Sequence, residues 1–264
     1  MTLWQAIILG IVQGIAEFLP ISSSGHLVLL QRVFGINEPG ITFDIVLHIG
    51  SLCAVFAVFW HDILALVKNP FQKMTAMLII GTIPVVVAGF ALRDYMDVFN
   101  SAFLLAAAFT FTGILLLIAD NIKHTNKGLR EMTILDAIII GCMQAVALPP
   151  GISRSGATIT GALVSGLNRE MAARFSFMLS IIAIVGAGTL EVWEVLGSYQ
   201  GVYRGNIPAY MIGFVAAAVS GYFSIQLLLE LIKKASLRYF AYYVFILASL
   251  ILADRFVFGL FFLV

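Results

Sequence analysis

The segment EFLPISSSGHL, residues 17–27, interrupts the first apolar stretch of this 264-residue sequence. An acid, a proline, three serines and a histidine stand here, where the flanking residues are mostly hydrophobic. Proline and a run of serines favour the end of one helix and the start of another over a continuous helix. The segment therefore predicts a break that carries polar groups into apolar surroundings.

The composition predicts the environment of that break. The chain is 61% hydrophobic and only 11% charged, which excludes an ordinary soluble domain and predicts an all-α polytopic membrane protein. Its net charge of +1 offers no basic surface, so nucleic acid is not an expected partner. Cys53 and Cys142 lie in apolar runs, where we expect them to pack as small hydrophobic residues.

Six apolar stretches reach the length of about 17–25 residues that a transmembrane helix needs. They are residues 43–60, 75–92, 101–119, 175–193, 209–229 and 238–253. Two other apolar regions, 4–34 and 133–167, are broken at LPISSSG and LPPGISRSG into arms too short to span. We expect both regions to form re-entrant helix–loop–helix hairpins, whose irregular backbone is tolerated only where protein or a cavity surrounds it.

The two hairpins belong to an internal repeat. AIILGIVQGIAEFLPISSSGH (6–26) aligns with AIIIGCMQAVALPPGISRSGA (137–157), and LLLIAD (115–120) aligns with SLILAD (249–254). The sequence thus predicts a single domain, 1–264, built from one repeat at about 1–122 and another at about 133–257. Each repeat holds one hairpin and three spans, an odd number, so we expect inverted topology with both breaks meeting near the membrane midplane.

The basic residues predict the orientation of these spans. One side carries Lys68, Lys73, Lys123, Lys127, Arg130, Arg169, Arg174, Lys233, Lys234 and Arg238, and the other carries Arg32, Arg93, Arg204 and Arg255. Cytoplasmic loops are enriched in Lys and Arg, so the first side is expected to be cytoplasmic. Both termini are then expected on the outer face.

Both breaks have the composition of an anion-binding site. Serines cap helix starts, and the free N–H groups of a first helical turn bind anions. The expected substrate-binding residues at the two helix starts are Ser22, Ser24, Gly25, Ser153, Ser155 and Gly156. Arg154 adds a guanidinium, which suits phosphate oxygens. A charge at this depth costs about 2.5–3.5 kcal/mol, which indicates a functional role, with a structural ion pair to Glu17 as the alternative.

The first break also carries groups that can perform chemistry. Ser23 offers a hydroxyl nucleophile, while Glu17 and His26 are candidate bases and Glu17 a candidate metal ligand. An anion cradle beside an activatable serine indicates phosphoryl transfer. Gln13 and its repeat equivalent Gln144 are interpreted as hydrogen-bonding across the hairpins, with a metal or lipid contact as the less favoured alternative. His48 either lines the cavity or packs in a span.

These residues carry a family resemblance. QGIAEFLPISSSGH (13–26) and PGISRSGAT (150–158) resemble the two signatures of the bacterial undecaprenyl-diphosphatase family, the bacitracin-resistance phosphatases, and FDIVLHIGSL (43–52) fits a further family stretch. The resemblance covers nearly the whole chain. It implies a multi-pass enzyme of the bacterial cell membrane that hydrolyses undecaprenyl diphosphate to undecaprenyl phosphate and phosphate. It also implies an active site open to the outer face, and a role in cell-wall synthesis and bacitracin resistance.

The resemblance further implies a divalent cation, Mg²⁺ or Ca²⁺, and functional roles for Glu17, the serine run 22–24, His26 and Arg154. Gly151 and Gln13 lie within the matching signatures and are included as substrate-binding residues. Because position 13 is Gln where the family also uses Glu, a metal site with two carboxylates is doubtful. Glu17 and the diphosphate would then hold the ion.

Two other interpretations remain at this stage. Inverted repeats with broken helices are also a design of secondary transporters, so a polyprenyl-phosphate flippase with an anion clamp is the alternative function. A purely structural membrane subunit is disfavoured by the cost of burying Glu17, His26 and Arg154. A homodimer is plausible, although no face of the predicted helices indicates one.

Overall fold

The computed structural model describes residues 1–36, 41–92, 98–99, 101–122, 125–197, 206–234 and 236–262. These residues form eleven α-helices followed by a π-helical turn. The elements are α1 (Leu3–Phe18), α2 (Ser23–Val33), α3 (Ile41–Val58), α4 (Trp60–Lys68), α5 (Lys73–Leu92), α6 (Ala102–Asn121), α7 (Ile134–Val146), α8 (Arg154–Val164), α9 (Arg169–Gly197), α10 (Ile207–Lys234), α11 (Arg238–Ala253) and η2 (Asp254–Phe258).

The helix lengths confirm an all-α polytopic membrane protein. In the described part of the chain, α5, α6, α9, α10 and the continuous segment of α11 and η2 (Arg238–Phe258) are long and apolar enough to cross a bilayer. The sixth expected span, 43–60, differs: α3 bends by 79° into α4 after Val58, and only the pair together passes the same test. Phe59 at the bend has φ −100° and ψ 21°, which interrupts the helix without a glycine or proline that could have indicated the bend.

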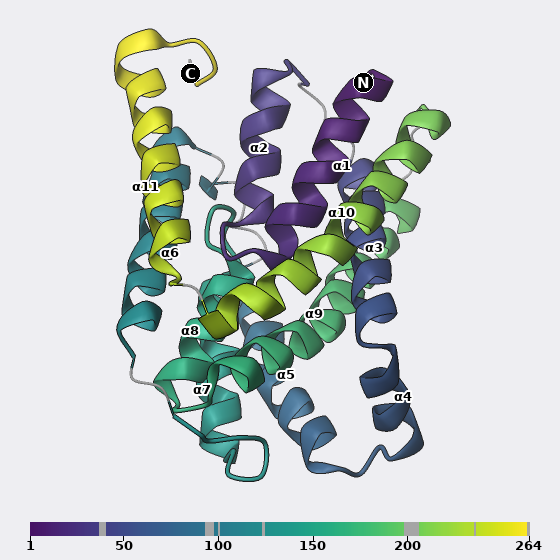
Figure 1. Cartoon of the computed structure of the whole chain (residues 1–264). Coiled ribbons are helices and arrows are strands. Elements are labelled where there is room, and N and C mark those ends of the chain that lie inside the picture. The colour runs from purple at the N-terminus through teal and green to yellow at the C-terminus, as the bar shows by residue number, and fades with distance from the viewer. Residues whose placement is uncertain are drawn as a thin grey trace.

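The two broken regions each form a pair of short helices. Figure 1 shows α1 and α2 in the upper part of the bundle and α7 and α8 in the lower part. The loops between the arms meet inside the bundle, where the Ser155 hydroxyl donates to the Leu19 carbonyl oxygen at 3.2 Å. The arms begin where the serines predict, since α2 starts at Ser23 and α8 at Arg154.

The two halves of the chain interlock. The most extensive packing of α1 is against α10, that of α7 is against α5, and α11 packs on α6. Glycines allow the close approach: a Cβ on Gly14 would lie 2.6 Å from the Gly221 nitrogen and against Ser220 and the Ala217 carbonyl. The Ser224 hydroxyl adds a hydrogen bond of 3.0 Å to the Ile15 carbonyl oxygen.

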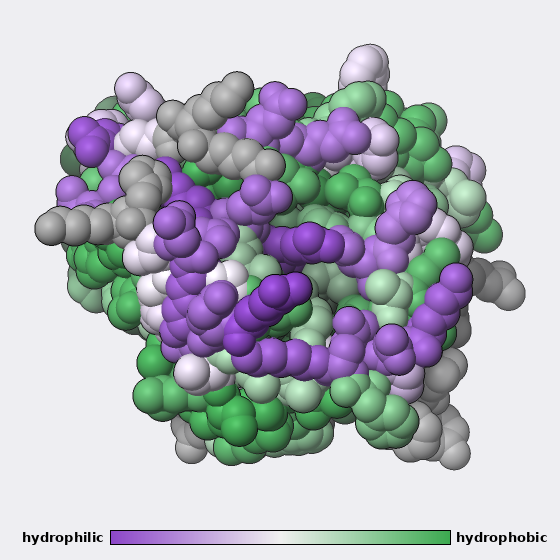
Figure 2. Space-filling model, turned by 60° about the horizontal axis from the view of Figure 1, so that its bottom comes forward, coloured by the Kyte–Doolittle hydropathy of each residue, from purple (hydrophilic) through white to green (hydrophobic). Residues whose placement is uncertain are grey.

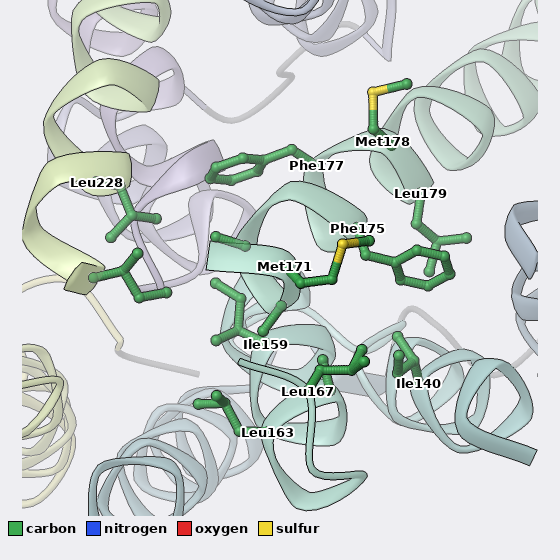
Figure 3. Packing of buried hydrophobic residues seen from close by; sticks show 14 of the residues in the cluster. Ile140, Ile159, Leu163, Leu167, Met171, Phe175, Phe177, Met178, Leu179 and Leu228 are labelled. Atoms are coloured by element: carbon green, nitrogen blue, oxygen red, sulfur yellow. The ribbon is translucent and has the colours of Figure 1, made fainter. Parts of the chain in front are cut away.

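A large hydrophobic core lies beside the second break. Figure 3 shows part of this core: Ile159 and Leu163 of α8 and Ile140 of α7 pack with residues of α9 and with Leu228 of α10. The core reaches the first break through Phe18, whose ring packs edge-on against that of Phe177 at 5.8 Å. Burial of these side chains holds both breaks against α9.

Hydrophilic side chains gather at the end of the bundle away from the start of α1, with hydrophobic flanks around them (Figure 2). Ion pairs tie this end together, Lys127–Asp136 at 2.6 Å and Arg238–Asp120 at 2.8 Å. It is the end expected to be cytoplasmic. Arg93, Lys123 and Arg204, which entered that expectation, lie outside the described residues, as do the side chains of Lys233 and Lys234.

Substituting Gly14 by Ala tests the close approach of α1 and α10. The added methyl group overlaps the backbone of α10, so the free energy of unfolding should fall by about 1–3 kcal/mol. Gly89→Ala is the matched control, because a Cβ there meets no atom within 4 Å. Thermal unfolding in detergent checks the difference, and equal melting temperatures for the two variants would contradict this packing.

Candidate active site

The first break is built by Leu19, Pro20 and Ser22. Leu19 has extended backbone, φ −64° and ψ 143°, as a residue before proline prefers, and this ends α1. Ser22 then caps α2, its hydroxyl accepting the Gly25 N–H at 3.3 Å. Ser22 has φ 71°, the one non-glycine residue with positive φ among those described. The surrounding structure must hold this strained backbone in place.

His26 provides that support. Its Nδ1 lies 2.6 Å from the Ser22 carbonyl oxygen and its Nε2 lies 2.7 Å from the Tyr243 hydroxyl on α11. A carbonyl oxygen can only accept, so Nδ1 carries the proton and Nε2 accepts from Tyr243 in the neutral ring. The ring also stacks on Tyr243, with 8° between their planes, and packs edge-on against Phe109. Both nitrogens of His26 are therefore occupied in holding the first break.

The second break repeats the pattern of caps. Ser153 caps α8, accepting the Gly156 N–H at 3.1 Å, and its hydroxyl lies 3.2 Å from that of Ser155. Gly151 supplies the left-handed backbone here, with φ 93°. Thr112 of α6 fixes the loop from outside: its hydroxyl donates to the Gly151 carbonyl oxygen at 3.1 Å and accepts the Ser153 N–H at 2.9 Å.

Glu17 joins the two breaks. Its Oε1 forms an ion pair with the Arg154 guanidinium, which comes from the other hairpin. Its Oε2 accepts from the Ser23 hydroxyl at 2.5 Å and from the Gln13 amide at 3.1 Å. The buried Glu17 carboxylate is therefore compensated by one charge and two hydrogen bonds, as a charge removed from water requires.

These groups face a cavity of about 160 Å³. Of the predicted site residues, those in its wall are Glu17, Ser22, Ser23, Ser24, Ser153 and Arg154. Ser155 and the glycines at 25, 151 and 156 shape the loops behind the wall; a Cβ on Gly25 would lie 2.9 Å from the Cα of Gly151. Gln13 and His26 act behind the wall through Glu17 and Ser22.

The predicted cross-hairpin hydrogen bonds of the glutamines are wrong for the described structure. Gln13 donates within its own helix to Glu17, and its Oε1 has no hydrogen-bond partner among the described residues. The amide nitrogen and oxygen of Gln144 are likewise buried without a partner in that part of the chain.

His48 lines the cavity, which resolves the alternative left by the sequence. Its Nδ1 lies 2.8 Å from the Asp44 carbonyl oxygen, and its Nε2 lies 3.9 Å from Glu17 Oε2. Thr112 and Tyr243 also contribute to the site, although neither belongs to the polar segments at the two breaks. In the alignment of LLLIAD with SLILAD, Tyr243 falls on Phe109. The tyrosine hydroxyl at a position where the other repeat has phenylalanine was the one sequence feature that could have identified Tyr243.

The side chains around the cavity can be compared with the ligands that the divalent cation implied by the resemblance would need. Within the described residues no group of three His, Cys, Asp or Glu side chains could hold a metal ion. The cavity offers oxygen donors instead, the Glu17 carboxylate and serine hydroxyls. Mg²⁺ is often held by one or two carboxylates together with substrate phosphates, so this set fits an ion that arrives with a diphosphate.

Fold and site together define a polytopic membrane protein with a hydroxyl-rich cavity, in whose wall an arginine pairs with a glutamate. The family model described as "Bacitracin resistance protein BacA" matches residues 6–250. The chain belongs to this family.

Curated relatives cover nearly the full chain. A protein of Carboxydothermus hydrogenoformans named undecaprenyl-diphosphatase is 44% identical over 253 residues, 96% of this chain and 97% of the relative. Undecaprenyl-diphosphatase 4 of Bacillus thuringiensis subsp. konkukian is 44% identical with the same coverage. Undecaprenyl-diphosphatase of Halothermothrix orenii is 40% identical over 96% of this chain and 98% of its own length.

Removing the Tyr243 hydroxyl tests the support behind the first break. Tyr243→Phe keeps the stacked ring but leaves His26 Nε2 without its partner, so Ser22 and the adjacent Ser23 lose their fixed position. We expect turnover to fall by up to about 100-fold, because small misplacements of a reacting group are this costly. Tyr242→Phe, one residue away and exposed, is the control. Equal turnover in the two variants would remove Tyr243 from this role.

Proposed function

We propose that this protein hydrolyses undecaprenyl diphosphate to undecaprenyl phosphate and inorganic phosphate, and so recycles the lipid carrier of cell-wall synthesis and contributes to bacitracin resistance. The observation that carries the proposal is the arrangement around Glu17. One carboxylate contacts a serine hydroxyl on its own hairpin and an arginine on the other, all in the wall of one cavity. A nucleophile, its base and an anion-binding group therefore occupy a single site.

Binding of the diphosphate falls to Arg154 and the N–H groups at the starts of α2 and α8. The guanidinium presents donors in a planar fork that matches phosphate oxygens, and helix starts attract anions. Arg154 pairs with Glu17 before substrate arrives, so the guanidinium is already held at the cavity wall. These donors stabilise the charge that develops on the phosphoryl oxygens in the transition state.

The chemical step begins at Ser23. Its Oγ attacks the terminal phosphorus while Glu17 accepts the hydroxyl proton across the 2.5 Å hydrogen bond. The bond to the bridging oxygen breaks, and undecaprenyl phosphate leaves. Glu17 passes its proton to the departing phosphate oxygen. It then takes a proton from the water that attacks the phosphoserine and returns it to Ser23 Oγ as inorganic phosphate is released. The contact with Ser23 favours Glu17 over His26 as the base, because both His26 nitrogens are engaged elsewhere.

Water as the direct nucleophile, with Ser23 only a hydrogen-bond donor, is the variant of this mechanism. A divalent cation, Mg²⁺ or Ca²⁺, would be held by Glu17 and the diphosphate and would neutralise part of the phosphate charge. A flippase would need the anion clamp but no nucleophile and base, so the Ser23–Glu17 contact and the names of the relatives favour hydrolysis.

The proposal includes the finer topology. We infer that α1–α2 and α7–α8 are re-entrant hairpins of two inverted repeats in the bacterial cell membrane. Their support is the shared cap pattern, Ser22 with Gly25 and Ser153 with Gly156, and their placement at opposite parts of the bundle (Figure 1). We expect the termini and the cavity opening on the outer face, because the basic residues at the other end of the bundle favour the cytoplasmic side. A homodimer stays a prediction.

Loss of the Arg154 guanidinium tests the binding and stabilising role. Arg154→Ala should lower phosphate release from undecaprenyl diphosphate in detergent by about 10²–10³-fold, the cost of removing one donor from a developing charge. Arg154→Lys should restore only part, because an ammonium cannot donate as a planar fork. Arg174→Ala is the control, since Arg174 also pairs with an acid, Asp62, but lies outside this cavity. Full turnover in Arg154→Ala would contradict the site.

Trapping the serine distinguishes the two nucleophiles. Acid quenching of wild-type protein during turnover should leave phosphate on Ser23, located by mass spectrometry, and Ser23→Ala should lose both the label and turnover. Ser249→Ala, on the exposed face of α11, should keep both. Turnover that persists in Ser23→Ala without a label would favour water as the nucleophile.

Chelation tests the cation. EDTA should abolish phosphate release, and Mg²⁺ or Ca²⁺ should restore it. The same treatment should leave the melting temperature in detergent unchanged, because the described residues alone supply too few ligands for a structural ion. Full activity in EDTA would remove the cation from the proposal.

A further inference from the structure

His48, on α3, lies in the wall of the cavity of about 160 Å³ that Glu17 and the serines also line. Its Nδ1 lies 2.8 Å from the Asp44 carbonyl oxygen, one turn earlier on the same helix. A carbonyl oxygen can only accept, so Nδ1 carries the proton and the lone pair of the neutral ring is on Nε2. The ring is thereby fixed with one nitrogen that can bind a metal ion.

The distance from His48 Nε2 to Glu17 Oε2 suits a shared cation better than a direct contact. The two atoms lie 3.9 Å apart, which is too long for a hydrogen bond. Metal ions such as Zn²⁺ bind nitrogen and oxygen ligands at about 2.1 Å, so two ligands of one ion lie at most about 4.2 Å apart. An ion between these two atoms therefore needs no rearrangement of α1 and α3, which pack against each other.

The contact with Asp44 is the support that a metal-binding histidine needs. Such histidines almost always donate their second ring N–H to a carbonyl, a carboxylate or water, which sets the tautomer and the orientation of the ring. His26 has no nitrogen left for this role, because Nδ1 contacts the Ser22 carbonyl oxygen and Nε2 contacts the Tyr243 hydroxyl. Of these two histidines, His48 is therefore the one that can act as a ligand.

The pair of ligating groups occurs in one repeat only. In the internal alignment Glu17 falls on Leu148 and His48 falls on Ser180. The repeated fold thus requires neither an acid nor an imidazole at these positions. Both groups stand in the first repeat, on two helices that pack together, and both face the same cavity.

We propose that His48 Nε2 and the Glu17 carboxylate are the protein ligands of the divalent cation, and that the site selects a first-row transition metal such as Mn²⁺ or Co²⁺. The inference rests on the proposed function, because diphosphate oxygens complete the coordination. Mg²⁺ and Ca²⁺ are bound mainly by oxygen ligands, whereas an imidazole nitrogen favours transition metals. One histidine among oxygen donors therefore shifts the preference of this site away from Mg²⁺ and Ca²⁺.

A site with two protein ligands depends on the substrate for its affinity. The described residues hold no group of three His, Cys, Asp or Glu side chains that could bind an ion alone. The Glu17 charge is already balanced by Arg154, so the charge that attracts the cation comes chiefly from the two phosphates. The ion should therefore bind weakly to the protein alone and tightly when the diphosphate is present.

Pulsed EPR detects a histidine ligand directly. Untagged protein labelled with ¹⁵N-histidine is mixed in detergent with Mn²⁺ and undecaprenyl methylenediphosphonate, whose bridging carbon resists hydrolysis. The spectrum should show one nitrogen bound to Mn²⁺, and His48→Gln should lose this coupling. His61→Gln, at an exposed position of α4, should keep it. A wild-type spectrum without the coupling, or a coupling that survives His48→Gln, would overturn the proposal.

The cation preference gives an independent measurement. Half-maximal phosphate release from undecaprenyl diphosphate should need about tenfold less Mn²⁺ or Co²⁺ than Mg²⁺. His48→Gln should raise the concentrations of the transition metals about tenfold and change that of Mg²⁺ little, whereas His61→Gln should behave as wild type. An unchanged preference in His48→Gln would remove His48 as a ligand. If the wild type released no phosphate with any cation, the proposed function would fail, while the nitrogen coupling would still decide whether His48 binds the metal.

Discussion

The ion pair between Glu17 and Arg154 is the interaction on which the centre of this protein depends. Each residue comes from a different broken helix pair, and each would be a costly isolated charge in apolar surroundings. Breaking such a pair is strongly destabilising, because it leaves one buried charge uncompensated. The pair therefore requires both breaks to meet, and their meeting forms the cavity that the serines line.

The rest of the structure supplies what two breaks inside an apolar bundle require. Serine hydroxyls cap the new helices, Thr112 satisfies the loop around Gly151, and the His26 ring satisfies the Ser22 carbonyl. Thr112 lies on α6, and Tyr243, which contacts the His26 ring, lies on α11; these two helices pack against each other. Besides crossing the membrane, α6 and α11 therefore hold the loops that carry the proposed chemistry.

Much of this architecture was accessible from the sequence. Proline and serine at 20–24 and 149–155 located both breaks, because the physics of helix ends is local. Arg154 and Glu17 were identifiable because charge is rare in such segments. The bend between α3 and α4 was not accessible, since no breaker stands at Phe59 and tertiary packing fixes it. The different roles of His26 and His48 could not be predicted from the sequence either. Only the fold brings His26 to Tyr243 and His48 to the wall of the cavity.

The interlocked packing has a consequence for synthesis. The first hairpin is made early, but α1 finds its main partner in α10, which ends at Lys234 of 264 residues, and Glu17 finds its counter-charge only at residue 154. Until those segments have left the ribosome, α1 lacks its main packing partner and Glu17 lacks the counter-charge of Arg154. The nascent first half must therefore wait in the translocon, at the membrane surface or with a chaperone, and a chain truncated before α10 would be a substrate for membrane quality control rather than a smaller folded protein.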